Sequence, residues 1–220
     1  HPSHYDYTSI YDLVIFRRLA SQDEAADEPE RKPPPGSARA PSAFRRIHTK
    51  AVSFAVFDRL LISVHPAGCF TARSFIQRYL SDAVVSEGLP ATVRSRLPFS
   101  PSDLMLRMVN VMVDSYLELR KQLTLQLEHW QQELLKPHSR FGNWNALMAA
   151  RNELRVLEDL CEEQHDAMQE WLDTLREQAA QLMAQGERDM LVARARDVIE
   201  HIQRVMHHVR RLEQGAETVV

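Results

Sequence analysis

The sequence lacks three features that would each assign a protein to a class. Its 220 residues include only two cysteines, Cys69 and Cys161, without paired spacing, which fits a reducing cytosol better than a disulfide-stapled secreted domain. No apolar run approaches the roughly eighteen residues that a membrane-spanning helix needs. Lysine and arginine are dispersed and the formal net charge is -3, so no basic stripe predicts nucleic-acid binding.

Apolar residues are plentiful enough to form a sizeable core. They make up 44% of the chain, which argues against a wholly disordered protein and allows one domain or a small domain with a long helical extension. The first residues contain neither a methionine nor a charged-then-apolar signal region. We therefore expect the chain to begin inside a longer protein.

Short β-strands are predicted in the N-terminal part. β-Branched and aromatic residues over 10–19 predict a buried strand. Residues 21–42 are first acidic and then rich in proline, so we expect a mobile loop there. Apolar residues then alternate over 52–57 and 60–64, on either side of Asp58-Arg59, which predicts a β-hairpin with a two-residue turn.

Helical spacing replaces this alternation further along the chain. Apolar residues over 75–84 predict a helix that ends before Gly88. Ser100 is placed to cap a second helix, whose apolar stripe over 105–134 predicts a length of roughly 50 Å. A third stripe covers 147–175. Because the loops are short, we expect consecutive helices to be antiparallel neighbours.

The C-terminal helix carries a heptad pattern. From Leu191 to Val219 the apolar residues alternate steps of four and three, and Gly215 lies inside this pattern without ending it. This predicts a helix that begins near Glu187, leaves the fold and continues beyond the last residue.

Together these elements predict an α+β fold. We expect a small α/β/α head with a mixed β-sheet over residues 1–99, two long antiparallel helices over 100–185, and a long terminal stalk helix over 186–220. The stalk would lead to a membrane region that the chain does not include.

Four stretches of this sequence resemble the CorA-type family of magnesium and divalent-cation transporters. They are HPSHYDYTSIYDLVIF, LLISVH, LMLRMVNVMVDSYLELRKQL with its Asp114-Ser115-Tyr116 element, and ARDVIEHIQRV. The last is similar to the opening of the family's stalk helix and contains Asp197, Glu200 and His201. The family's Gly-Met-Asn pore motif and its membrane helices would lie beyond Val220.

The resemblance implies the cytosolic, regulatory domain of a homopentameric Mg2+ channel at the inner cell membrane, with Co2+ or Ni2+ as further cargo. It implies no enzymatic activity. The isolated fragment should be monomeric or weakly associated, because the membrane helices that would close the ring are absent.

The resemblance also implies a regulatory metal site. Asp197 occupies the position of a stalk aspartate that faces acidic residues of the neighbouring subunit, here Asp23 and Glu24, while Glu200 and His201 lie beside it. Carboxylates of two subunits repel each other, and a Mg2+ ion that keeps part of its water shell can bridge them. Removing the ion would loosen the interface.

Simpler interpretations of the same residues stay open. Asp197, His201, Arg204 and His208 share a helix face, and spacing alone favours a solvated surface over a chelating site. His65 and Cys69 could suggest a nucleophile and its base, but Pro66 and Gly68 between them favour a turn, and no third orienting group is recognisable.

Two other functions compete with magnesium transport. One is the zinc-transporter branch of the same superfamily, which would have a similar domain. The other is a non-transport helical scaffold that recruits a partner along its apolar seams. The residues following Val220 would distinguish the scaffold from a transporter.

Overall fold

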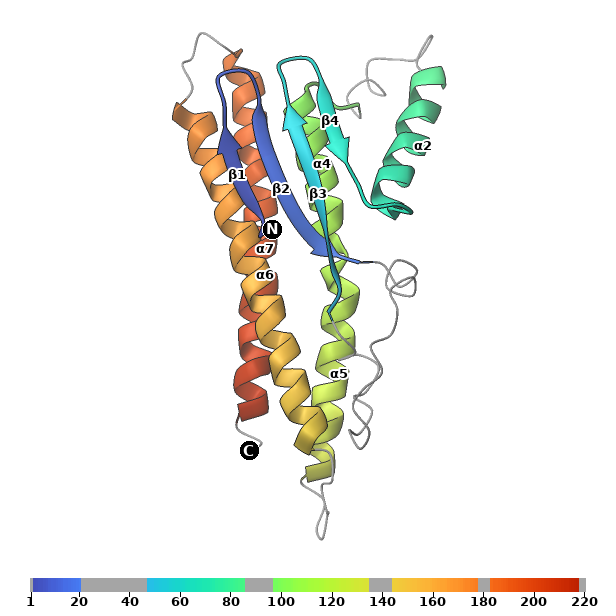
Figure 1. The fold of residues 1–220 in the computed structure, drawn as a ribbon, viewed down its shortest axis with the longest axis vertical. Helices are drawn as coiled ribbons and strands as arrows, with labels where there is room; N and C mark the ends of the chain where they lie inside the picture. Colours follow the sequence, from blue (N-terminus) through green and yellow to red (C-terminus); the bar gives the residue numbers. More distant parts are fainter. Residues whose placement is uncertain (1, 21–46, 86–96, 135–143, 178–182, 218–220) are drawn as a thin grey trace.

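Four strands and five helices make up the part of the chain that the computed structural model describes, which covers residues 2–20, 47–85, 97–134, 144–177 and 183–217 (Figure 1). The predicted α+β class is confirmed. The elements are β1 His4–Tyr7, β2 Asp12–Leu19, β3 Thr49–Val56, β4 Leu61–Val64, α2 Phe70–Val85, α4 Pro101–Asp114, α5 Tyr116–Leu134, α6 Trp144–Glu177 and α7 Gln185–Glu217.

The sheet is antiparallel throughout, in the order β1-β2-β3-β4. The prediction of a mixed sheet is therefore wrong for the described strands. Parallel neighbours need a long crossover, usually helical. In this sheet β2 and β3 are hydrogen-bonded neighbours that run in opposite directions, and Ala20 N–H donates to the His48 carbonyl at 2.9 Å just beyond their ends. The predicted hairpin is confirmed, because Phe57 N–H donates to the Leu60 carbonyl across the Asp58-Arg59 turn.

Sequence reasoning missed the edge strand β1. Its four residues are His-Tyr-Asp-Tyr, which show no apolar alternation. Its turn into β2 is organised by Thr8, whose hydroxyl donates to the Tyr11 carbonyl at 2.6 Å and accepts from Tyr11 N–H at 3.0 Å. A short polar edge strand of this kind depends on its neighbour and leaves little trace in the sequence.

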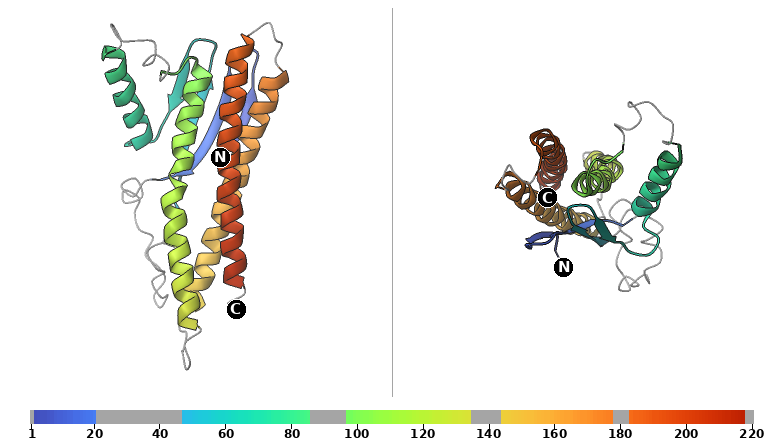
Figure 2. Two further views of the ribbon diagram at one scale, coloured as in Figure 1. Left: turned by 180° about the vertical axis from the view of Figure 1, so that it is seen from behind. Right: turned by 90° about the horizontal axis from the view of Figure 1, so that it is seen from above.

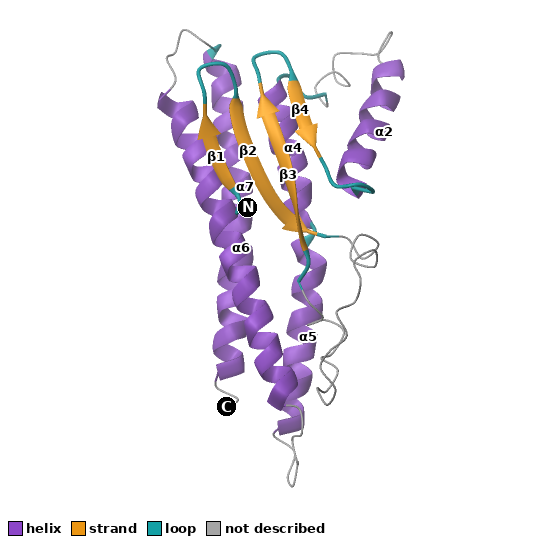
Figure 3. Cartoon of the chain, viewed as in Figure 1, coloured by secondary structure: helices purple, strands orange, loops and turns teal. Residues whose placement is uncertain are grey.

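One face of the sheet rests on helices α4 and α6 (Figure 3). Alternate residues of a strand point to the same face, and the inward ones are buried. In β2 and β3 the register pairs Val14 with Phe54 and Phe16 with Val52, and all four are 0% exposed. They join the core formed by the helices.

The first long helix is capped as predicted but is interrupted. Ser100 Oγ accepts from Asp103 N–H at 3.1 Å, and Pro101 opens the first turn. A single helix over 105–134 was expected, yet α4 ends at Asp114 and α5 begins at Tyr116. Ser115 Oγ donates to the Met112 carbonyl at 2.6 Å, a back-bond that disturbs a helix locally. Because Ser115 keeps helical dihedral angles, the chain continues in nearly the same direction.

Helix α7 packs against the other long helices over its described length. The expectation of a stalk that leaves the fold is therefore wrong for these residues. Helix α7 lies along α6 on one side and along α4 and α5 on the other (Figure 2). The predicted heptad seam is confirmed over the described residues, where its apolar members are buried: Leu191, Ala195, Val198, Ile202, Val205, Val209 and Leu212. Burial of this seam within one chain accounts for the heptad pattern, and α6 and α7 are antiparallel neighbours as predicted.

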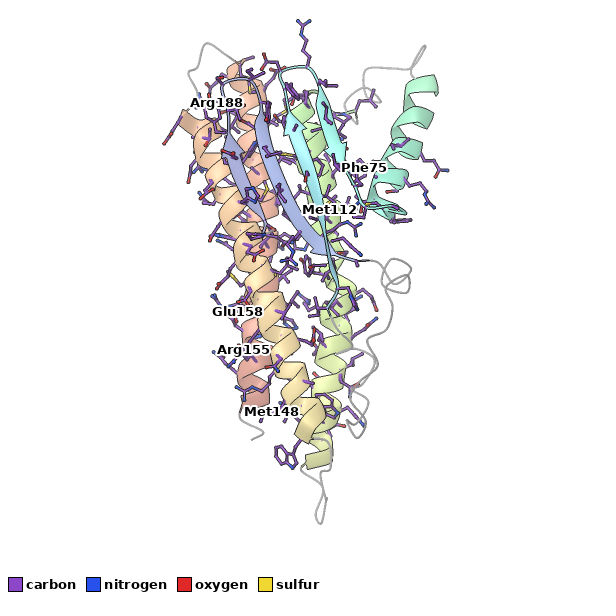
Figure 4. All side chains as sticks on the ribbon, viewed as in Figure 1. Phe75, Met112, Met148, Arg155, Glu158 and Arg188 are labelled. Carbon is purple, nitrogen blue, oxygen red and sulfur yellow. The ribbon has the colours of Figure 1, made fainter. Side chains whose placement is uncertain are left out.

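Ion pairs join the outer surfaces of α6 and α7. Arg155 and Glu158 of α6, both labelled in Figure 4, contact Glu213 and Arg210 of α7. Within the described residues, no helix is long and apolar enough to cross a membrane.

Candidate functional site

Three of the residues suggested as metal ligands, Asp197, Glu200 and His201, lie on helix α7. Asp197 and Glu200 are exposed, while Val198 and Ile199 between them are buried. The heptad accounts for the burial of Val198 and for the exposure of the two carboxylates, whereas Ile199 lies beside the seam and also packs into the core. Neither carboxylate has a hydrogen-bond or ion-pair partner within the described part of the chain, so both are available to a ligand from outside it. Asp23 and Glu24 fall outside the described residues.

His201 is held in a contact within the chain. Its Nδ1 lies 3.3 Å from Asp114 Oδ1, at the C-terminal end of α4, and its side chain is 15% exposed. Burial lowers the pKa of His201; Asp114 opposes this shift, while Arg204 and Arg120 add to it. The imidazole is therefore neutral at pH 7 and can donate its Nδ1 proton to the carboxylate. The structure thus separates His201, which joins α7 to α4, from the exposed Asp197 and Glu200.

The Asp114-Ser115-Tyr116 element lies where three helices meet. Asp114 reaches α7 through His201, and Ser115 interrupts the helix. Tyr116 is 1% exposed, and its hydroxyl accepts from Gln164 Nε2 of α6 at 2.8 Å. Burial raises the pKa of Tyr116 well above its usual value, so the phenol keeps its proton. These contacts give the element a structural role in holding the junction of α4 and α5 against α6 and α7.

A buried carboxylate, that of Asp103, links α4 to α7. Asp103 is 0% exposed, and it lies 3.0 Å from Arg107 and 2.6 Å from Arg194. Phe99 N–H also donates to its Oδ2 at 3.3 Å. The spacing of Asp103 and Arg107 predicts their helical pair, but no local pattern points to Arg194. Since Arg194 lies one turn before Asp197, this ion pair positions the exposed carboxylate.

The described residues do not contain a complete metal site. Within them, no group of three or more His, Cys, Asp or Glu side chains is placed to hold a metal ion. A cation at Asp197 would therefore take its remaining ligands from water, from residues outside the described ranges or from another copy of the chain. Mg2+ binds in this way more readily than Zn2+, because it usually keeps several waters and needs only one or two carboxylates.

Comparison with known proteins identifies related sequences and folds. The family model described as CorA-like Mg2+ transporter protein matches residues 38–220. Among solved structures, the complete CorA magnesium transporter from Methanocaldococcus jannaschii has a TM-score of 0.62 at 12% identity, over 99% of this chain and 56% of that chain. A search of curated protein sequences found no match.

Two further solved structures share this fold. The full-length CmaX protein has a TM-score of 0.53 at 12% identity, over 100% of this chain and 57% of that chain. The ZntB cytoplasmic domain from Vibrio parahaemolyticus has a TM-score of 0.52 at 12% identity, over 99% of this chain and 73% of that domain. At such identities the likeness concerns the fold alone. The chain spans little more than half the length of the CorA and CmaX structures.

Proposed function

Because this chain belongs to the CorA-like Mg2+ transporter family, we propose that it is the cytosolic, ion-sensing domain of a divalent-cation channel. The family match over residues 38–220 carries the proposal. The exposed carboxylates of Asp197 and Glu200 on α7 support it, because they are open to a cation and to a neighbouring subunit.

Membrane attachment is part of the same proposal. The full-length protein would continue beyond Val220 into two membrane spans with a Gly-Met-Asn motif between them. The lengths of the CorA and CmaX structures support this, since each is much longer than the present chain. The domain would then lie at the cytoplasmic face of the inner membrane, and the protein would assemble as a homopentamer.

Regulation would follow from ion binding between subunits. In the closed ring, Asp197 of one subunit would face Asp23 or Glu24 of the next, and hydrated Mg2+ would reduce the repulsion between the carboxylates. An ion that binds the closed assembly better than the open one shifts the population toward the closed state as its concentration rises. Internal Mg2+ would thus limit its own uptake.

Replacing Asp197 tests the proposed sensor. Asp197→Ala should weaken the protection of the cytosolic domain by Mg2+ against protease, and it should leave transport less inhibited by internal Mg2+. Asp197→Lys should partly restore the closed state without metal, because an ammonium supplies part of the cation's charge. The measurement is Mg2+ influx into proteoliposomes containing the full-length protein as internal Mg2+ is raised, with proteolysis in parallel.

Asp159→Ala is the matched control. Asp159 is likewise an exposed aspartate on a long helix, and it has no partner within the described residues. It should behave as the unmodified protein does. If Asp197→Ala and Asp197→Lys also leave inhibition and protection unchanged, Asp197 is an ordinary surface residue and the sensor assignment is wrong.

The likeness to the ZntB cytoplasmic domain favours zinc transport as a second candidate. The two candidates differ in the cargo ion, so the same proteoliposomes should be loaded in parallel with Mg2+, Co2+, Ni2+ and Zn2+. Influx of Zn2+ without Mg2+ influx would select the zinc branch. A soluble domain directly after Val220, or no influx of any of these ions, would favour a non-transport scaffold.

A further inference from the structure

A cluster of three side chains surrounds Cys69 at the junction between the sheet and helix α2. Arg18 comes from β2, His65 directly follows β4, and Cys69 directly precedes α2. Arg18 Nη2 lies 3.2 Å from Cys69 Sγ, and His65 Nδ1 lies 3.6 Å from the same sulfur. The turn between His65 and Cys69 brings these two together, and the orienting group that sequence reasoning did not find is Arg18.

The three groups are held in place by their surroundings. Arg18 is 4% exposed, and its Nη1 donates to the Leu19 carbonyl at 2.8 Å. The His65 ring stands edge-on to Phe54, which is itself fully buried, with centroids 6.1 Å apart. Cys69 N–H donates to the Pro66 carbonyl, and the Cys69 carbonyl accepts from Arg73 N–H. Cys69 is thus the N-cap residue of the 16-residue helix α2.

Both neighbours of the sulfur can act as hydrogen-bond donors. Burial, followed by the charge of Arg18, lowers the pKa of His65, so its ring is neutral at pH 7. His65 Nε2 is buried and lacks a hydrogen-bond partner within the described residues. We assign the ring proton to Nδ1, because a buried lone pair without a partner costs less than a buried N–H without an acceptor. Arg18 and His65 then both point an N–H toward Sγ, so two hydrogen-bond donors surround the sulfur.

The arrangement suits an electrophile better than a metal ion. A guanidinium 3.2 Å from the sulfur would repel a divalent cation, whereas it stabilises negative charge on sulfur, as does the N-terminal end of a helix. Although Cys69 is only 5% exposed, Ala67, Gly68 and Phe70 beside it are exposed. The sulfur therefore lies just below the surface, which favours a small neutral oxidant over a bulky disulfide.

We propose that Cys69 is a modification site that reacts with hydrogen peroxide, with Arg18 and His65 as positioning residues. The Cys69 thiol gives its proton to solvent, the sulfur lone pair attacks one peroxide oxygen, an S–O bond forms and the O–O bond breaks. Sulfur is oxidised by two electrons to sulfenic acid, and the other oxygen leaves as hydroxide, which takes up the proton released by the thiol and becomes water. This inference is independent of the sensor on α7, because α4 lies between α2 and α7 (Figure 2).

Cys161 supplies an internal control for the test. It is 0% exposed on α6, and burial raises its pKa to about 12. The whole protein is treated with hydrogen peroxide, its sulfenic acid is trapped with dimedone, and labelling of the two cysteine peptides is followed by mass spectrometry. In the folded protein we expect Cys69 to be labelled at least about tenfold faster than Cys161.

Variants of the two positioning residues distinguish a slower reaction at Cys69 from a loss of folding. Arg18→Met and His65→Leu should each slow labelling of Cys69 by about fivefold or more, because each removes a donor to the sulfur. Arg18→Lys should retain most of the rate because it keeps the charge. A variant that unfolds would expose Cys161 and reveal itself by labelling it too. If Arg18→Met unfolds, the half-buried His65 supplies the decisive variant.

Two results would overturn the proposal. The first is labelling of Cys69 in the folded protein at the rate of Cys161. The second is unchanged labelling of Cys69 in a folded His65→Leu variant. Neither result would affect the sensor assignment, which depends on Asp197 and on ion influx.

Discussion

Removing the charge of Asp103 should measurably loosen the attachment of α7 to α4. Asp103→Asn keeps the size of the side chain and one oxygen acceptor, but it removes the negative charge between Arg107 and Arg194. Breaking a fully buried ion pair costs about 3–5 kcal/mol. The arginine side chains here are 18% and 36% exposed, so water can solvate them in the variant. We therefore expect a loss of about 2 kcal/mol in the free energy of unfolding.

This loss can be measured by urea denaturation and by thermal melts, both monitored by circular dichroism. For a chain of this length, about 2 kcal/mol corresponds to a fall of about 4–8 °C in Tm. Asp173→Asn is the matched control, because Asp173 is 52% exposed and pairs with Arg176 on the same helix at 2.9 Å; it should leave Tm unchanged. Arg194→Met combined with Asp103→Asn should cost less than the sum of the single changes. A Tm for Asp103→Asn equal to that of the unmodified protein would refute the reasoning.

Three further predictions concern stability. Burial raises the pKa of Asp12, which accepts a hydrogen bond from the Tyr5 hydroxyl, so the folded state favours the protonated carboxyl. The contribution of Asp12 to stability is therefore fully present below about pH 4 and is lost as pH rises. Asp12→Asn should raise Tm at about pH 7 but not at about pH 3. Gly215→Ala should stabilise α7 by about 0.5 kcal/mol, because alanine favours the helix more than glycine does. The added Cβ would lie 3.4 Å from Leu127, which is not a clash. Urea denaturation measures the effect, and a loss of stability would show that the packed helices cannot accept the methyl group. Burial lowers the pKa of His201, so the unfolded state takes up the proton more readily than the folded state. The contribution of His201 to stability should therefore decline as pH falls below about 6.5. His201→Gln should flatten that decline in thermal melts.

Local patterns predicted most of the fold because burial repeats along the elements. The alternation of apolar residues at Val52, Phe54 and Val56 predicts β3, and the apolar seam from Leu191 onward predicts α7. Each signal is repeated several times within one element. The break at Ser115 has no repeated signal, as it depends on one hydroxyl bonding to one carbonyl. Strand β1 is too short and too polar to show a period.

The candidate site was predicted only in part for the same reason. The exposure of Asp197 follows from its place between seam residues, and the structure agrees. Its surroundings depend on contacts between residues far apart in sequence, such as Asp103 with Arg194 or Asp114 with His201. A single sequence carries no local pattern for such pairs. In the same way, His65 and Cys69 were recognised as a possible pair, but their third partner, Arg18, lies on another element and was not.

The polar contacts of α7 bear on how the proposed sensor would respond to ions. Three of them fix α7 at successive levels of the bundle, namely Asp103 with Arg194, Asp114 with His201, and Thr124 with His208 at 3.0 Å. A slide of α7 by one turn, about 5.4 Å, would break all three and shift the buried seam out of register. Loss of one hydrated ion at an exposed carboxylate supplies too little free energy to drive such a slide of α7. A response to Mg2+ at Asp197 should therefore move whole chains relative to one another and leave α7 seated within its own chain.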